Sequence, residues 1–152
     1  MRRYAGIRTA ATNTTSTTAP MWAVYGAATF RLALYDLLHG ADATPADNYG
    51  EFNLVRATTL GTTSATFTPQ ALDPGDPAAL GSFVTTWSLQ PTVGAATTGV
   101  LQWTQNSRAA FRWVAVPDGE IIIAATAAAG LACMPVGSNT ATTYQTTIHW
   151  RE

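Results

Sequence analysis

The chain is poor in charged residues, and its basic residues are all of one type. Asp, Glu, Lys and Arg make up only 11% of the 152 residues, against a usual ~25% in soluble domains. Lysine is absent, so all eight basic residues are arginine. The net charge is −1, so the chain has no large basic field to attract nucleic acid or an anionic membrane. The sequence therefore predicts that neither is a partner.

Two explanations of the low charge stay open at this point. A free soluble monomer normally has a charged surface, so partner molecules could cover part of this one. The alternative is a surface that is simply neutral and rich in threonine. The preference for arginine is equally open: its planar fork of donors suits fixed interface contacts, but a high-GC genome would also favour it.

Residues for common catalytic and metal sites are scarce. Cys133 is the only cysteine and lies in an apolar run, so no intrachain disulfide is possible and a small buried side chain is expected. One cysteine and two distant histidines, His39 and His149, do not supply a zinc site. No Gly-x-Ser-x-Gly elbow or phosphate-binding glycine loop occurs. The sequence predicts a protein that is not an enzyme and holds no metal or cofactor, with His39 in a turn and His149 on the polar face of the last strand.

Calcium is the metal for which the loops offer ligands. Asp42 with Asp47, or Asp73 with Asp76, could contribute carboxylates. Both pairs flank proline, where aspartate more often bonds its own backbone and forms a turn. Turn formation is therefore the favoured interpretation of both pairs.

Strand-like patterns dominate the chain. In residues 144–151 apolar and polar side chains alternate, which is typical of a half-buried strand. The three isoleucines at 121–123 suggest a strand buried on both faces. Residues 30–38 fit a helix or a strand, and the neighbouring segments favour a strand. The other candidate strands are 21–26, 52–60, 63–68, 83–90, 97–105, 111–116, 120–124 and 130–136.

Eight or nine short strands separated by turn residues predict an all-β fold. We expect a single-domain antiparallel β-sandwich with jelly-roll-like connections. Residues 69–81 contain three prolines and two glycines, which should bar regular sheet and allow one helical turn near Pro77. Residues 1–19 form a Thr-rich tract, predicted to be an extended N-terminal arm or a partly exposed strand that pairs with a partner's edge. Residues 20–152 would form the β-sandwich domain.

Aromatic and arginine residues are densest between residues 103 and 113. Stacking aromatics beside arginine suit single-stranded nucleic acid, but the net charge favours Trp103 and Trp113 in the core, with arginines covering its rim. Trp, Tyr and Arg also concentrate binding energy at protein interfaces. The candidate interface residues are Arg2, Arg3, Tyr4, Arg8, Arg108 and Arg112.

Four segments carry a resemblance to a known family. They are Tyr35–Asn48 (YDLLHGADATPADN), Pro69–Pro74 (PQALDP), Arg108–Glu120 (RAAFRWVAVPDGE) and Thr147–Glu152 (TIHWRE). With them, residues 20–152 resemble the capsid cement, or decoration, proteins of tailed bacteriophages. The resemblance brings no functional residues with it.

The resemblance implies a virion structural protein, made in the host cytoplasm and bound to the outer surface of the capsid. It would self-associate, with a trimer favoured, and its partner would be the major capsid protein. One alternative is a lectin-like jelly-roll protein of the tail or fibre that binds a host glycan. A third hypothesis, a small hydrolase, would require two carboxylates facing each other in a cleft.

Overall fold

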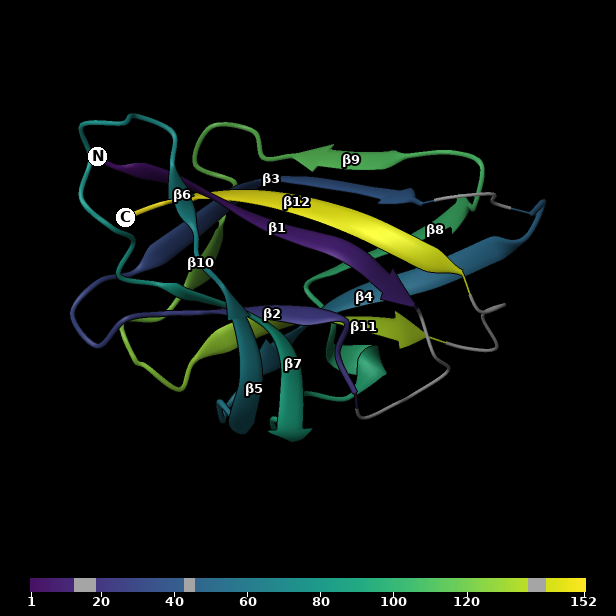
Figure 1. Cartoon of the computed structure of the whole chain (residues 1–152), viewed down its shortest axis with the longest axis horizontal. Coiled ribbons are helices and arrows are strands. Elements are labelled where there is room, and N and C mark those ends of the chain that lie inside the picture. The colour runs from purple at the N-terminus through teal and green to yellow at the C-terminus, as the bar shows by residue number, and fades with distance from the viewer. Residues whose placement is uncertain (13–18, 43–45, 137–141) are drawn as a thin grey trace.

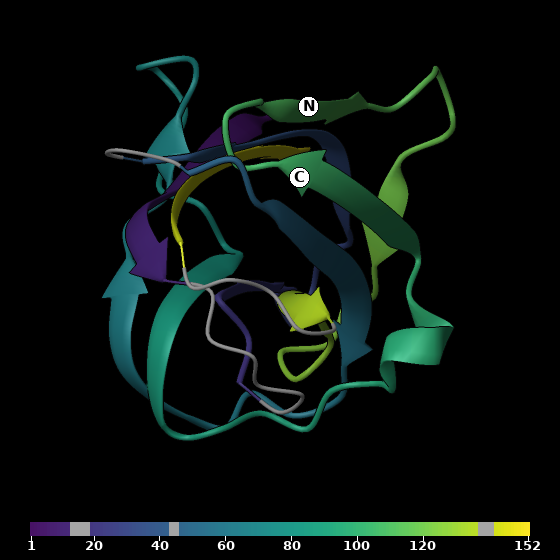
Figure 2. The same cartoon turned by 90° about the vertical axis from the view of Figure 1, so that its right-hand side faces the viewer.

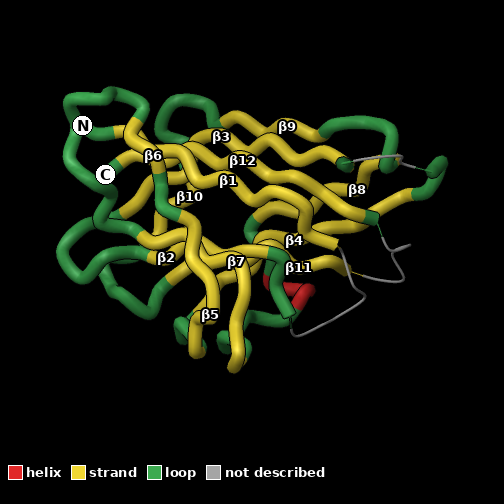
Figure 3. The backbone as a smooth tube through the Cα atoms, in the orientation of Figure 1, coloured by secondary structure: helices red, strands yellow, loops and turns green. Residues whose placement is uncertain are grey.

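The structure, a computed structural model, describes residues 1–12, 19–42, 46–136 and 142–152. The chain folds almost entirely into strands, with one short 3₁₀ helix (Figures 1 and 3). The strands are β1 (Arg3–Thr12), β2 (Trp22–Tyr25), β3 (Leu32–Ala41), β4 (Tyr49–Ala57), β5 (Thr62–Phe67), β6 (Gln70–Ala71), β7 (Ser82–Leu89), β8 (Leu101–Asn106), β9 (Phe111–Val114), β10 (Ile121–Ile123), β11 (Gly130–Val136) and β12 (Thr143–Arg151), and the helix is η1 (Ala96–Thr98).

These strands form two six-stranded antiparallel sheets that pack against each other. Sheet A has the order β10-β3-β12-β1-β6, with β9 pairing along the same edge of β3 as β10. Sheet B has the order β5-β7-β2-β11-β4-β8. Viewed end-on, the two layers surround a common interior (Figure 2). The predicted all-β antiparallel sandwich is confirmed, while the jelly-roll connectivity stays a prediction.

Large aromatic and aliphatic side chains from both sheets fill this interior. Sheet A contributes Tyr4 and Trp150, and sheet B contributes Trp22 and Phe83, all fully buried. The Trp22 and Phe83 rings lie 5.6 Å apart. Gly6 lies under this cluster, because a Cβ there would come within 3.0 Å of both Phe83 and Trp150. Such burial of large rings supplies most of the driving force for folding.

The ambiguous segment at residues 30–38 is part of a strand that contains a bulge. The β3–β12 register shifts between His149 and Trp150, so Leu34 and Asp36 are partners of adjacent residues and Tyr35 is the extra residue. A bulge interrupts strict alternation, so Leu34 and Leu37 both face the interior although they are three positions apart. This spacing explains why the segment also fits a helical pattern.

The N-terminal segment differs from the predicted arm. Residues 3–12 form β1, a strand of sheet A that pairs with β12 over most of its length. Tyr4 and Ala11 are buried in the core, which ties β1 to the sandwich. For these residues the strand alternative is correct and the extended arm is not confirmed. Residues 13–18, the most Thr-rich part of the predicted arm, lie outside the described residues.

Three smaller predictions are corrected. Residues 69–81 contain a two-residue strand, β6, and no helical turn at Pro77. His39 lies fully buried in β3 rather than in a turn. Ile122 is 40% exposed, because β10 is an edge strand and only one of its faces meets the core. The predicted burial of Cys133 is confirmed.

Both chain ends lie close together at one end of the sandwich (Figure 1). The backbones of Arg2 and Glu152 exchange two hydrogen bonds, of 3.2 and 3.0 Å. The Glu152 carboxylate also accepts hydrogen bonds from the backbone amides of Leu80 and Gly81 and from the Trp150 indole. The irregular segment after β6 is thereby fixed to the end of β12.

Candidate functional site: the open face of sheet A

Sheet A has one face against sheet B and one face that no described helix or sheet covers. We call the second surface the open face. Its side chains follow from the register of the strands. They are Arg3, Ala5, Ile7, Ala33, Tyr35, Asp36, Leu38, Arg112, Val114, Ile122, Gln145, Thr147, His149 and Arg151.

A charged cluster from three strands lies at the centre of the open face. Asp36 on β3 accepts two hydrogen bonds from Arg112 on β9, from Nε at 3.1 Å and from Nη2 at 3.0 Å. His149 Nδ1 on β12 lies 3.1 Å from the same carboxylate. The Tyr35 ring stacks on His149 with a centroid distance of 6.1 Å. The bulge makes this possible, because it places Tyr35 and Asp36 on the same face.

This environment lowers the pKa of Asp36 and raises the pKa of Arg112, so both shifts favour the charged forms. Burial alone would raise the pKa of Asp36, but the hydrogen bonds from Arg112 and His149 outweigh burial and lower it. The hydrogen bond to Asp36 in turn raises the pKa of the exposed Arg112 guanidinium. Asp36 is therefore a fixed anion that orients Arg112, and the Arg112 side chain is still 62% exposed. An oriented and accessible arginine is well placed to bind a partner.

Two hollows lie at opposite ends of the open face. One, of about 190 Å³, lies over Gly40 between Leu38 and Gln145. The other, of about 290 Å³, is lined by Tyr35, Arg3 and the 2.7 Å ion pair between Arg151 and Glu120. Such depressions give an otherwise flat sheet places for a partner's side chains to enter.

The six candidate interface residues do not form one surface. Arg3 and Arg112 lie on the open face, and Arg2 is exposed beside it at the chain terminus. Arg108 is exposed in the turn between β8 and β9.

Tyr4 and Arg8 occupy different positions from these. Tyr4 is fully buried, so its interface assignment is wrong; its hydroxyl donates to the Pro77 carbonyl at 3.0 Å. Arg8 pairs with the inward-facing Thr146 and is half-buried, and burial lowers its pKa. Tyr4 and Arg8 both lie on the inward-facing row of β1, which explains why Tyr4 is buried and Arg8 is half-buried.

The aromatic residues of the dense group lie in and against the core rather than on a binding surface. Trp103 is buried and stacks on Phe111 at 4.9 Å, and Trp113 packs against the same core. His39 lies among these rings and stacks on Tyr144 at 4.8 Å. Burial lowers its pKa to about 3, so it is a neutral core residue. The core interpretation of the tryptophans is confirmed.

The candidate calcium ligands make other contacts. Asp73 Oδ1 accepts a 2.9 Å hydrogen bond from the Gly75 amide, which is a turn-forming contact. Asp47 accepts a hydrogen bond from the Asn106 side chain at 2.6 Å. Within the described ranges, no three His, Cys, Asp or Glu residues are grouped as a metal site would require. No helix of those residues has the length and apolar character needed to cross a membrane.

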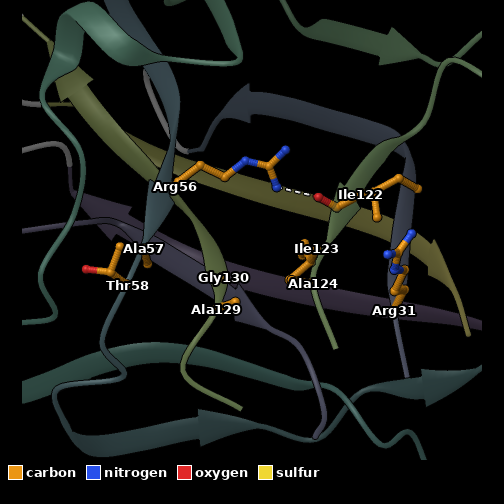
Figure 4. A pocket seen from close by; sticks show the side chains of 9 residues that line it. All are labelled: Arg31, Arg56, Ala57, Thr58, Ile122, Ile123, Ala124, Ala129 and Gly130. Carbon is orange, nitrogen blue, oxygen red and sulfur yellow. Dashed lines mark hydrogen bonds between the residues drawn. The ribbon is translucent and has the colours of Figure 1, made fainter. Parts of the chain in front are cut away.

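A further pocket, which we call the edge pocket, lies where β10 of sheet A faces β4 and β11 of sheet B (Figure 4). Its volume is about 490 Å³. Arg56 extends from β4 and donates a hydrogen bond from Nη1 to the carbonyl oxygen of Ile122. Arg31 reaches the pocket from the chain just before β3. The nine lining residues are Arg31, Arg56, Ala57, Thr58, Ile122, Ile123, Ala124, Ala129 and Gly130.

Sequence reasoning missed the central cluster and the edge pocket. In the sequence, Asp36 lies 76 positions from Arg112 and 113 positions from His149. Only the sheet register brings the three side chains together. Their polar character within apolar strands was the one available signal. Arg31 and Arg56 had no distinguishing pattern at all.

A scan against protein-family models finds no match for this chain, and searches of the curated proteins and of the solved structures find no significant similarity.

Proposed function

We propose that this chain is a capsid cement protein of a tailed bacteriophage. It would bind the outside of the major capsid shell through the open face of sheet A and bridge neighbouring capsomers, so that the head resists internal pressure. The observation that carries the proposal is the open face itself. Leu38 and Val114 are about half exposed there, at 44% and 54%. Leu38 is the cross-strand partner of the oriented Arg112, and Val114 lies two residues further along β9.

The composition of the open face supports a protein partner. Exposed apolar side chains gathered on one surface and surrounded by polar groups mark interaction sites. Arginine is enriched in the residues that dominate binding energy at such sites. The low overall charge also fits a surface that is partly covered in an assembly. The partner identity comes from the sequence resemblance to cement proteins, and the trimeric state is part of the same proposal.

The mode of action would be multivalent. A protomer that contacts two capsomers through modest interfaces becomes firmly attached, because the second contact forms at a high effective concentration. A trimer would multiply these contacts. Many weak contacts of this kind stabilise a shell without any catalytic chemistry.

Binding of the purified chain to shells of the phage that encodes it tests the proposal. Cosedimentation should show a fixed number of copies per shell, and electron microscopy should place their density over capsomer junctions. Leu38→Asp should reduce occupancy at least about 10-fold, because a carboxylate replaces an apolar contact. The matched control is Leu89→Asp, at a residue that is 66% exposed at the end of β7 in sheet B, and its occupancy should be unchanged.

Density at the tail, or equal occupancy for both variants, would contradict the proposal. The first result would remove the capsid partner. The second would remove the open face as the binding surface.

A host-glycan-binding role in a tail or fibre is the second candidate, and one hollow of the open face favours it. Tyr35 lines the 290 Å³ hollow beside the Arg151–Glu120 pair, and an aromatic ring beside charged groups suits a sugar. A glycan array would show specific binding that Tyr35→Ala abolishes. Tyr49→Ala, at an exposed tyrosine on β4, is the control. No bound glycan would dismiss this candidate.

A further inference from the structure

We infer that the edge pocket between Arg31 and Arg56 binds a carboxylate carried on a short aliphatic chain. The inference concerns a site apart from the open face and does not depend on the capsid proposal. It rests on three features of the pocket: its unbalanced positive charge, a fixed arginine and its aliphatic lining.

The charge of the pocket is unbalanced. Arg31 and Arg56 are both exposed, and none of the nine lining residues is acidic. In the part of the chain that the structure describes, the three ion pairs involve Asp36 or Glu120, and none of them includes Arg31 or Arg56. Two guanidinium groups without a carboxylate leave this pocket complementary to an anion.

One of the two arginines is held in place. The Arg56 side chain bridges the two sheets by donating to the Ile122 carbonyl on β10 (Figure 4). This bond restricts the guanidinium before any ligand arrives, so less side-chain entropy is lost on binding. Arg31, from the chain just before β3, lines the same pocket (Figure 4), so it offers a second guanidinium to the ligand.

The lining selects the chemistry of the anion. Ile122, Ile123, Ala57, Ala124 and Ala129 present aliphatic surface to the pocket. An alkyl chain that bears a carboxylate gains from burying its methylene groups against this surface, and the carboxylate matches the planar fork of a guanidinium. Inorganic phosphate matches the fork equally well but gains nothing from the apolar lining. A volume of about 490 Å³ is sufficient for a dicarboxylate or for an acidic side chain of a peptide.

The test is a titration of the isotope-labelled full chain with glutarate at low salt, followed by amide NMR. Chemical-shift changes should concentrate at Ile122–Ala124 and at Ala129–Gly130. Arg31→Gln and Arg56→Gln should each weaken binding at least about 10-fold, since charge-assisted bonds of this kind are strong. Arg108→Gln removes an exposed arginine elsewhere and should leave the affinity unchanged.

Arg31→Gln and a second ligand separate a loss of binding from a loss of folding and identify the source of the carboxylate. Arg31 has no hydrogen bond or ion pair with another described residue to lose, so Arg31→Gln should fold normally even if Arg56→Gln loosens the contact between the sheets. A short peptide with two glutamates identifies the source of the carboxylate: tighter binding than glutarate indicates a protein partner, and weaker binding indicates a small molecule. No shift at the pocket, an unchanged affinity of Arg31→Gln, or tighter binding of phosphate than of glutarate would each overturn the assignment.

Discussion

The two sheets of this sandwich present opposite kinds of outer surface. The outer face of sheet B carries Ala23, Tyr25, Val55 and Ala132, all fully buried. Trp87 near the end of β7 and Val93 in the chain that follows it pack on this face. The open face of sheet A carries exposed Leu38 and Val114 around a charged cluster. The central strands of sheet B, β2, β4 and β11, are therefore buried on both faces, and sheet A has a face available for a partner.

The amino-acid patterns of the strands account for this difference. β11 is apolar or small at successive positions and is buried at almost every one, whereas β12 alternates between buried and accessible residues. A strand buried on both faces needs a continuous apolar run, and a strand buried on one face needs alternation. Gly130 is part of the same arrangement, because a Cβ there would lie 2.6 Å from the Tyr25 ring. The comparison therefore predicts that equivalent substitutions on the two faces have very different costs.

The largest effect is expected on the covered face of sheet B. Val55→Asp buries a charge without a partner, and we expect a loss of about 4 kcal/mol or more in the free energy of unfolding. Urea denaturation followed by tryptophan fluorescence measures this loss. A variant that remains within about 1 kcal/mol of the parent protein would show that the segment after β7 does not seal this face.

The next effect concerns His39, which lies between the two sheets. Its pKa is about 3 in the folded chain against an ordinary 6.5, so the unfolded state binds more protons between these values. Stability is thus fully present above pH 6.5 and falls as the pH is lowered. At pH 5 the loss is about 2 kcal/mol relative to pH 7.5.

Denaturation curves at several pH values measure this dependence. His39→Gln provides the comparison, because it removes the titrating group and should flatten the curve between pH 5 and 7. An equally steep curve in this variant would assign the acid sensitivity to other groups.

A smaller effect is expected in the central cluster of the open face. Asp36→Asn removes the charge that orients Arg112 and His149, and we expect a loss of about 1 kcal/mol, since one partner is well exposed to solvent. The lowered pKa of Asp36 means that this contribution is present above its ordinary pKa of 3.8 and is lost as the pH falls through the lower, folded-state value. A double-mutant cycle with Arg112→Gln measures the coupling. Strict additivity of the two changes would show that the pair contributes nothing to stability.

The smallest effect on stability is expected for Leu38→Asp on the open face, within about 0.5 kcal/mol. Leu38 is half exposed and lies directly opposite Arg112, so a carboxylate there stays in water beside a positive charge. Thermal unfolding should show a nearly unchanged midpoint. A large loss of stability would mean that the open face is covered within the protomer, which would remove the contrast with Val55.

Sequence patterns predicted the positions of the strands better than they predicted the burial of each strand's two faces. The range 130–136 matches β11, and the alternation from Tyr144 to Trp150 matches the inward row of β12. The three isoleucines of β10 predicted burial on both faces, but an apolar run is buried on both faces only where a packed layer covers each of them, and Ile122 faces outward. The Thr-rich composition of the N-terminus did not predict the burial of β1. That burial comes from Tyr4 and Ala11 in a sheet completed by the last strand of the chain.

The sequence by itself determined the all-β fold, the position of most strands, the burial of Cys133, the placement of Trp103 and Trp113 in or against the core, and the low charge of the surface, because these depend on local alternation and composition. Only the tertiary structure decided which face stays open, that Asp36 holds Arg112 and His149, and that Arg31 and Arg56 line one pocket. Those features depend on register and on a single bulge at Tyr35. A shift of one residue turns every side chain to the opposite face, and no local pattern records where that shift falls.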